Sequence, residues 1–158
     1  MKWHDWLDEW NMTGLKIKAP FMEMEWQPQD KDKSAAWELY IELLTRIATQ
    51  SLPDANGDEQ SALDSIYSIF GTTREVIKSN GRGCLEFTKI AIIVLNQIIR
   101  PFTAKWHRLS AQGAFSDSAQ CQEFHVELRE LQEKLHAYTG MLGQMAGVEE
   151  DLTQLQDI

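Results

Sequence analysis

From about residue 32 almost to the C-terminus, apolar residues recur every three or four positions, and no segment of this range alternates as a strand does. That spacing gathers the apolar side chains on one face of a helix, which is buried against a neighbouring element. The sequence therefore predicts an all-α fold, a helical bundle of about four main helices.

Turn-forming residues mark where these helices begin and end. Gly71 to Thr73 is expected to separate two helices, and Pro101 to kink or end another, because proline lacks the N–H of a helix interior. Asp117 followed by Gln120 resembles a capping box at the start of the last helix. The expected helices cover 33–51, 58–70, about 73–80, 83–99 and 118–145, with a further turn or two over 102–109.

The same spacing predicts which side chains point inward. The run 90–95 is apolar all round, which is typical of the central helix of a bundle. A loop is expected over 53–57, while Gly140 and Gly143 are expected to loosen the last helix before a frayed tail that starts at Glu149. In the helix over 33–51, the expected inward residues are Trp37, Tyr40, Ile41, Leu44 and Ile47.

The first 31 residues have a different pattern. A short helix is expected over 2–11, with Gly14 as its stop. Residues 15–26 then alternate between apolar and charged side chains, with a break at Pro20, and this pattern predicts an extended arm. The predicted organisation is a Trp-rich N-terminal helix and extended arm over 1–31, a bundle over 32–147 and an acidic tail over 148–158.

The N-terminal helix and the arm both need something to contact. Trp3, Trp6 and Trp10 share one stripe of the helix, which either docks on the chain's own core or, with Trp26 of the arm, anchors a partner protein. The arm's backbone lies across its own bundle or pairs with a second copy or a partner. The acidic residues beside the tryptophans disfavour membrane docking, because interfacial helices usually carry basic residues.

Length and composition fit one globular domain. The chain has 158 residues, of which 43% are hydrophobic and 25% charged. No window is long and apolar enough to cross a membrane, and the N-terminus lacks the pattern of a secretory signal. Cys84 and Cys121 fit no zinc or redox spacing, which indicates reduced thiols in the cytoplasm. His125 lies one turn from Cys121, which we interpret as a coincidence of the helix surface.

Charge is distributed unevenly along the chain. The net charge is −9, but residues 72–108 carry +5 while the segments on either side carry −7 each. An acidic chain disfavours broad binding of nucleic acid, which depends on basic surface. The basic segment leaves a local anion site possible near residues 100–108; alternatively, it packs between the acidic segments.

A polar stripe lies close to Pro101. Asn96, Arg100, Thr103 and His107 follow one another at helical spacing on an otherwise apolar stretch. An arginine followed after six residues by a histidine resembles the signature of HEPN ribonucleases, small all-α proteins frequent in bacterial toxin–antitoxin and antiviral systems. The resemblance implies that Arg100 steadies phosphate charge and His107 transfers protons at a dimer interface. The alternative is that Arg100 pairs with a carboxylate and His107 is a surface imidazole.

No complete metal or cofactor site is predicted. Glu133 and His136 form one Glu-x-x-His pair, whereas a ferritin-like di-iron site needs two such pairs. Glu38 and Glu42 lack the Glu-x-x-Glu spacing that magnesium sites of all-α pyrophosphatases resemble. The chain also lacks a phosphate-binding glycine loop and a nucleophile elbow. We therefore expect neither a metal nor a cofactor.

The sequence favours a non-enzymatic protein-interaction module that acts in a complex with itself or with a partner. In this interpretation Trp3, Trp6, Trp10 and Trp26 are the anchors, because buried aromatic residues dominate interface energetics. The alternative function is a metal-independent, HEPN-like ribonuclease or nucleotide-binding domain that uses Arg100 and His107. A third hypothesis, an acidic mimic of nucleic acid, rests on charge alone.

Overall fold

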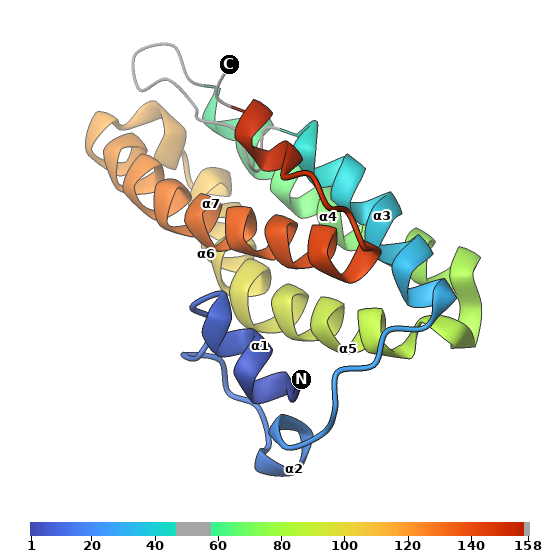
Figure 1. Ribbon diagram of the computed structural model, residues 1–158. Helices are drawn as coiled ribbons and strands as arrows, with labels where there is room; N and C mark the ends of the chain where they lie inside the picture. Colours follow the sequence, from blue (N-terminus) through green and yellow to red (C-terminus); the bar gives the residue numbers. More distant parts are fainter. Residues whose placement is uncertain (47–57, 157–158) are drawn as a thin grey trace.

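The computed structural model describes residues 1–46 and 58–156, most of which are helical (Figure 1). These residues contain no strand beyond one isolated bridge, so the all-α prediction is confirmed. The loop expected over 53–57 and the side chain of Ile47 lie outside the described ranges. None of the helices described is long and apolar enough to cross a membrane. The bundle consists of α3 (Asp30–Leu44), α4 (Glu59–Asn80), α5 (Leu85–Val94), α6 (Arg100–Ala111) and α7 (Ser118–Ala146).

Helix α3 begins three residues earlier than expected because its cap lies further upstream. Asp32 Oδ2 accepts the backbone N–H of Gln29 at 2.7 Å, as one half of a capping box. The other oxygen of this buried carboxylate, Oδ1, accepts the backbone N–H of Phe87 at 2.9 Å. One aspartate therefore both caps α3 and joins it to α5.

The prediction of which α3 residues face inward is largely wrong. Trp37 and Ile41 are exposed, Leu44 is half-buried, and of the four described residues expected inside only Tyr40 is buried. Small residues take much of the buried face, so that neighbouring helices approach α3 closely. The buried face comprises Asp32, Ala35, Ala36, Leu39, Tyr40 and Leu43.

The break expected at Gly71 to Thr73 does not occur, and α4 continues through it. Its first turn is capped by Asp58, whose side chain accepts the N–H of Ser61 at 3.0 Å. A glycine inside a helix costs only about 1 kcal/mol relative to alanine. Burial of Phe70 and Val76 on either side of the glycine outweighs that cost.

Pro101 neither ends nor breaks its helix, because a π-helical segment, η2 (Leu95–Ile99), joins α5 to α6. The N–H of Arg100 bonds the carbonyl of Leu95, five residues back. Pro101 then occupies the first turn of α6, where a missing N–H is tolerated. Helical structure therefore continues to Ala111, and the turn expected over 102–109 is part of α6. The run 90–95 is not buried all round, since Ile92 is exposed.

The arm is folded more tightly than predicted. Helix α1 (Trp3–Glu9) is followed by α2 (Ala19–Met22), a helical turn that begins beside Pro20 where extended chain was expected. The arm then returns to the N-terminus, where the N–H of Trp26 bonds the carbonyl of Met1 at 2.7 Å. The arm therefore pairs with the first residues of its own chain, and Figure 1 shows α1 and α2 together below α5.

The glycines of α7 serve close packing instead of loosening the helix. A Cβ at Gly140 would lie 2.5 Å from the ring of Trp10, and one at Gly143 would lie 3.0 Å from the ring of Tyr40. The tail is not frayed over its described part. Leu152 donates its backbone N–H to the Tyr40 hydroxyl at 3.2 Å, and η4 (Leu152–Leu155) lies against the end of the bundle.

Candidate functional site

Arg100 and His107 lie two turns apart on the side of α6 that faces α4. The Arg100 guanidinium is 4.8 Å from the ring centroid of Phe70, and the His107 ring meets Tyr67 edge-on at 4.8 Å. Arg100 also donates through Nε to Asn96 at 3.3 Å, so the carboxylate partner suggested by sequence is replaced by an amide and a ring. Thr103 does not share this polar stripe, because its buried hydroxyl donates to backbone carbonyls of its own helix.

The basic side chains of residues 100–108 do not form one cluster, because they lie on two faces of α6. Lys105 points toward α7 and pairs with Glu123 at 3.0 Å and Glu127 at 2.5 Å. These hydrogen bonds, first that of Glu127, raise the pKa of Lys105. Lys105 therefore stays protonated, and the two glutamates compensate its charge. Arg108 is the exposed basic side chain next to His107 on α6.

The tryptophan stripe faces inward. Trp3 and Trp6 are 0% exposed, so the structure places neither of them where a partner protein reaches it. Gln144 Oε1 on α7 accepts the indole N–H groups of both Trp6 and Trp10, at 2.8 and 2.9 Å. The Trp26 ring stacks at a tilt on Trp6 with centroids 4.6 Å apart. The burial of Trp3 and Trp6 contradicts the prediction that they anchor a partner protein. Of the four predicted anchors, only Trp10 and Trp26 retain exposed surface, and both are half-buried.

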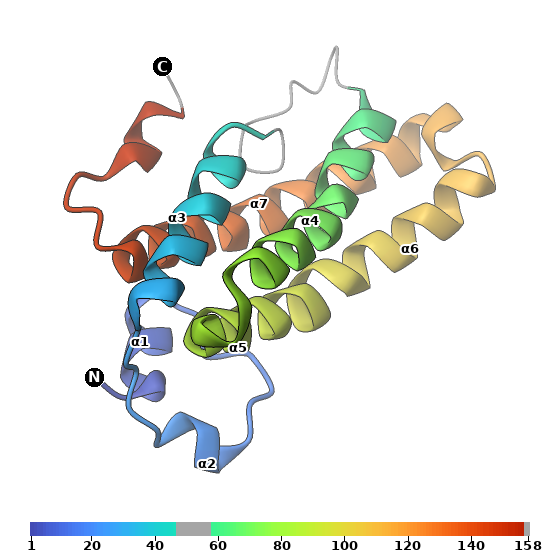
Figure 2. The ribbon, with the colours of Figure 1, turned by 90° about the vertical axis from the view of Figure 1, so that its right-hand side faces the viewer.

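An apolar groove follows the contact between α3 and α4, which lie side by side in Figure 2. It encloses about 450 Å³. Trp37 and Ile41, with exposed fractions of 46% and 37%, form one wall, and Val76 of α4 lies opposite. Helical spacing did not predict this site, because it placed both large residues, Trp37 and Ile41, in the core. The neighbouring pair Ala35 and Ala36 was the available signal, since small residues mark where helices approach.

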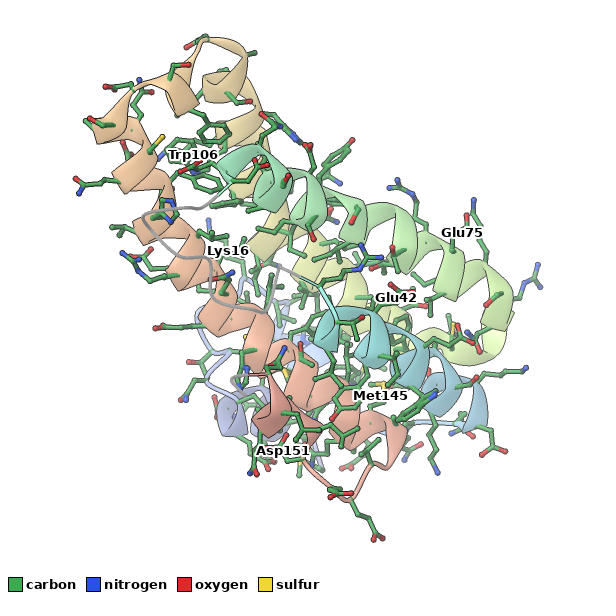
Figure 3. All side chains as sticks on the ribbon, turned by 90° about the horizontal axis from the view of Figure 1, so that it is seen from above. Lys16, Glu42, Glu75, Trp106, Met145 and Asp151 are labelled. Atoms are coloured by element: carbon green, nitrogen blue, oxygen red, sulfur yellow. The ribbon has the colours of Figure 1, made fainter. Side chains whose placement is uncertain are left out.

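Carboxylates border this groove. Glu38, Glu42 and Glu75 all line it, and Figure 3 shows Glu42 on α3 and Glu75 on α4 along the same face. Arg46 pairs with Glu42 at 2.7 Å and also donates to Ser68 at 2.6 Å, which holds the end of α3 against α4. Glu42 is therefore paired, whereas Glu38 and Glu75 form no ion pair among the described residues and keep the border acidic.

A third constellation lies where α7 begins, beside the start of α4. His125 Nε2 is 3.0 Å from Glu59 Oε1, and the imidazole is 5% exposed. Cys121 lies one turn earlier on the edge of the same cavity, which encloses about 870 Å³. Burial, followed by the charges of Glu59 and Asp117, raises the pKa of the Cys121 thiol. The thiol therefore remains protonated at neutral pH, and a thiolate nucleophile is disfavoured.

No three histidine, cysteine or acidic side chains gather closely enough to hold a metal ion within the described part of the chain. The pair Glu38 and Glu42 noted in the sequence has other contacts. Glu42 is engaged by Arg46, and Glu38 accepts from the Asn80 amide at 3.2 Å. Comparison with known proteins adds no assignment: no family model, no curated protein and no solved structure matches this chain.

Proposed function

We propose that this protein is an interaction module that binds a basic, amphipathic helix of a partner protein in the groove between α3 and α4. The observation that carries the proposal is the exposure of Trp37 and Ile41 beside each other on α3. Tryptophan is the residue type most enriched among interface hot spots. An apolar groove with anchors one turn apart suits a helix that presents apolar residues at matching spacing.

The acidic border supports a basic partner. Three glutamates line the groove, no lysine or arginine of the described residues lines it, and Arg46 is already engaged by Glu42, Ser68 and Thr72. Lysines and arginines flanking an apolar helix face would meet these carboxylates and set the orientation of the partner. A second copy of this chain would bring the same acidic border, and the chain carries −9 overall. Charge therefore favours a different protein over self-association.

This proposal moves the anchors from the N-terminus to α3. Deleting residues 1–26 would remove Trp3 and Trp6 from the core, so that truncation would report on folding and not on binding. Substitutions on the exposed wall of the groove are the direct test. Trp37→Ala removes an exposed side chain, whereas Tyr67→Ala removes a similarly exposed aromatic residue from the other side of α4 and serves as the control.

The experiment uses two labelled helical peptides with the same leucine face, one with lysines and one with glutamates on the polar face. Fluorescence polarisation with the full chain is expected to show binding of the lysine peptide only. Trp37→Ala is expected to weaken it about tenfold, since a hot-spot truncation costs more than 1 kcal/mol. Equal binding of both peptides, or equal losses in Trp37→Ala and Tyr67→Ala, would refute the proposal.

A second candidate function remains the cleavage or binding of RNA at Arg100 and His107. The observation in its favour is the exposed ring of Tyr67 beside His107, because aromatic and basic side chains together bind single strands. Purified protein incubated with an RNA pool and a chelator tests it. Cleavage that disappears in His107→Ala would support the ribonuclease. Absence of both cleavage and RNA binding would remove this candidate.

A further inference from the structure

A cavity lies between the loop after α1 and the π-helical segment η2. It encloses about 430 Å³, within the range of small-molecule sites. Its wall on one side is the loop, which contributes Asn11, Met12, Leu15 and Lys16; Ile98 of η2 and Lys134 of α7 complete it. Residues from three elements that are distant in the sequence therefore line this cavity.

Two local features hold the loop in this position. Asn11 adopts a left-handed conformation, with φ of 57°, and Met12 donates its N–H to the carbonyl of Leu7 at 2.8 Å. This arrangement is a Schellman motif that ends α1 three residues before the expected Gly14. Further on, the backbone of Lys16 is bonded in both directions to the side chain of Gln97. The cavity wall is thus fixed by hydrogen bonds at both ends.

The charge of this cavity is opposite to that of the chain. Lys16 and Lys134 line it, both are exposed, and neither forms an ion pair with a carboxylate among the described residues. No aspartate or glutamate of the described chain lines it. By contrast, carboxylates line the cavity beside His125, the one beside Asp151 and the α3–α4 groove. In a protein of net charge −9, two lysines facing a cavity without a carboxylate create a local preference for an anion.

The floor of the cavity is apolar and continues along the bundle. Met12 and Ile98 are only 4% and 7% exposed. A second cavity of about 310 Å³ adjoins the first, since Gln97, Ile98 and Lys134 line both. Beyond these shared residues, three apolar side chains (Pro101, Phe102 and Leu131) and three charged ones (Lys105, Glu127 and Glu130) line the second cavity. Lys105 and Glu127 pair with each other. An apolar tail that extends from the two ammonium groups can therefore contact the three apolar side chains between charged borders.

We propose that this cavity binds an amphipathic anion, a carboxylate or phosphate group carried on an apolar chain. The acidic head would contact the ammonium groups of Lys16 and Lys134, and the tail would lie over Ile98 toward Pro101 and Phe102. This site is separate from the α3–α4 groove and does not depend on the function proposed there. The irregular helix supports the choice, because π-helical turns occur frequently at functional sites.

The experiment is calorimetric titration of the full chain with decanoate, decyl phosphate and decylamine, three probes with unbranched alkyl tails of nearly equal length. Binding of either anion at one site per chain is expected, without binding of decylamine, and the stronger anion identifies the head group. Lys16→Gln and Lys134→Gln are each expected to weaken binding about tenfold, because each removes a charge-assisted hydrogen bond. Lys78→Gln is the control, since it makes the same charge change on α4, away from both cavities.

Amide shifts in the ¹⁵N spectrum locate the ligand. Shifts at residues 11–16 and 97–98 upon addition of decanoate are expected, with Trp37→Ala leaving the affinity unchanged. The proposal is overturned if neither anion binds, if decylamine binds as tightly as the anions, or if the Lys134→Gln and Lys78→Gln proteins bind alike. Shifts confined to the α3–α4 groove would also overturn it while leaving the peptide-binding proposal to its own test.

Discussion

The backbone of Lys16 and the side chain of Gln97 form two reciprocal hydrogen bonds. The N–H of Lys16 donates to Gln97 Oε1 at 2.6 Å, and Gln97 Nε2 donates to the carbonyl of Lys16 at 2.8 Å. The amide side chain therefore takes the place of a neighbouring strand for one residue of the arm. Gln97 belongs to the π-helical segment that precedes Pro101, so the same irregularity that accommodates the proline also carries the group that holds the arm.

Gln97→Ala is expected to release the arm locally. The Lys16 N–H would lose its acceptor, and two hydrogen bonds at about 1 kcal/mol each would be lost from a partly exposed site. Native-state hydrogen exchange should show faster exchange of the Lys16 amide with little change for the core of α7. Unchanged protection of Lys16 in this variant would contradict the role given to Gln97.

Glycine substitutions are expected to have opposite effects on two helices. Gly140→Ala would place a Cβ 2.5 Å from the Trp10 ring and should destabilise the protein by roughly 1–3 kcal/mol. Gly71→Ala meets nothing within 4 Å inside α4 and should stabilise it by about 0.5–1 kcal/mol. Urea denaturation of both variants measures the two free energies of unfolding. A neutral Gly140→Ala would show that Trp10 does not pack on α7 as described.

Asp32→Asn is expected to weaken the link between α3 and α5. The carboxylate accepts backbone N–H groups from Gln29 and Phe87 with separate oxygens, whereas an amide offers only one acceptor. One buried N–H would lose its partner, at a cost of about 1–3 kcal/mol in the free energy of unfolding. Asp30→Asn, at an exposed position in the same turn, is the control and should change stability by less than about 0.5 kcal/mol.

Alkaline pH is expected to destabilise the protein through Tyr138. Burial raises the pKa of this hydroxyl far above its ordinary value of 10.0, so the folded state keeps the proton. The unfolded state loses the proton near pH 10, and stability is therefore present below that pH and falls as the pH rises through it. Thermal melts of wild type and Tyr138→Phe between pH 8 and 11 measure this effect. The variant should lose part of the alkaline decline, by up to about 1.4 kcal/mol per pH unit.

The matched control for this prediction is Tyr67→Phe. Tyr67 is 54% exposed, so the substitution removes a hydroxyl group outside the core. That variant should keep the alkaline decline of the wild type. An identical pH dependence for Tyr138→Phe and Tyr67→Phe would show that the buried hydroxyl does not govern alkaline stability.

Several expectations failed where a local signal was outweighed by packing. Gly71 marks a plausible break, but the apolar residues on both sides of it are buried on one continuous helix. Pro101 was expected to kink or end its helix, and it does not end it, because the π-helical turn directly before it accommodates the missing N–H. At Gly140 the sequence indicated a loosened helix, although the missing side chain is what lets Trp10 approach. The outcome at Gly140 therefore depended on a residue far away in the chain.

In the candidate sites, too, some features were predictable from local spacing and others depended on packing. Helical spacing placed Arg100 and His107 on one side of α6, and the structure agrees with that placement. Their neighbours Phe70 and Tyr67 come from another helix and had no signal in the sequence. Sequence left open whether Trp3 docks on the core or anchors a partner, and it placed Trp37 on the inward face, whereas Trp3 is buried and Trp37 is exposed. Residue type alone gives both the same preference for burial.

The helical character of the chain could be predicted from sequence alone, because the apolar period of three to four residues is a property of neighbouring positions and needs no knowledge of the partner helix. The position of the last helix could be predicted as well, since it begins and ends within one residue of the expected range. Tertiary contacts determine which of two adjacent apolar stripes on α3 is buried and which lysines form an ion pair with a carboxylate. These outcomes follow from which helices meet, and that is set by the sum of many distant contacts, so Trp37 lines a groove and Lys134 lines a cavity only in the assembled bundle.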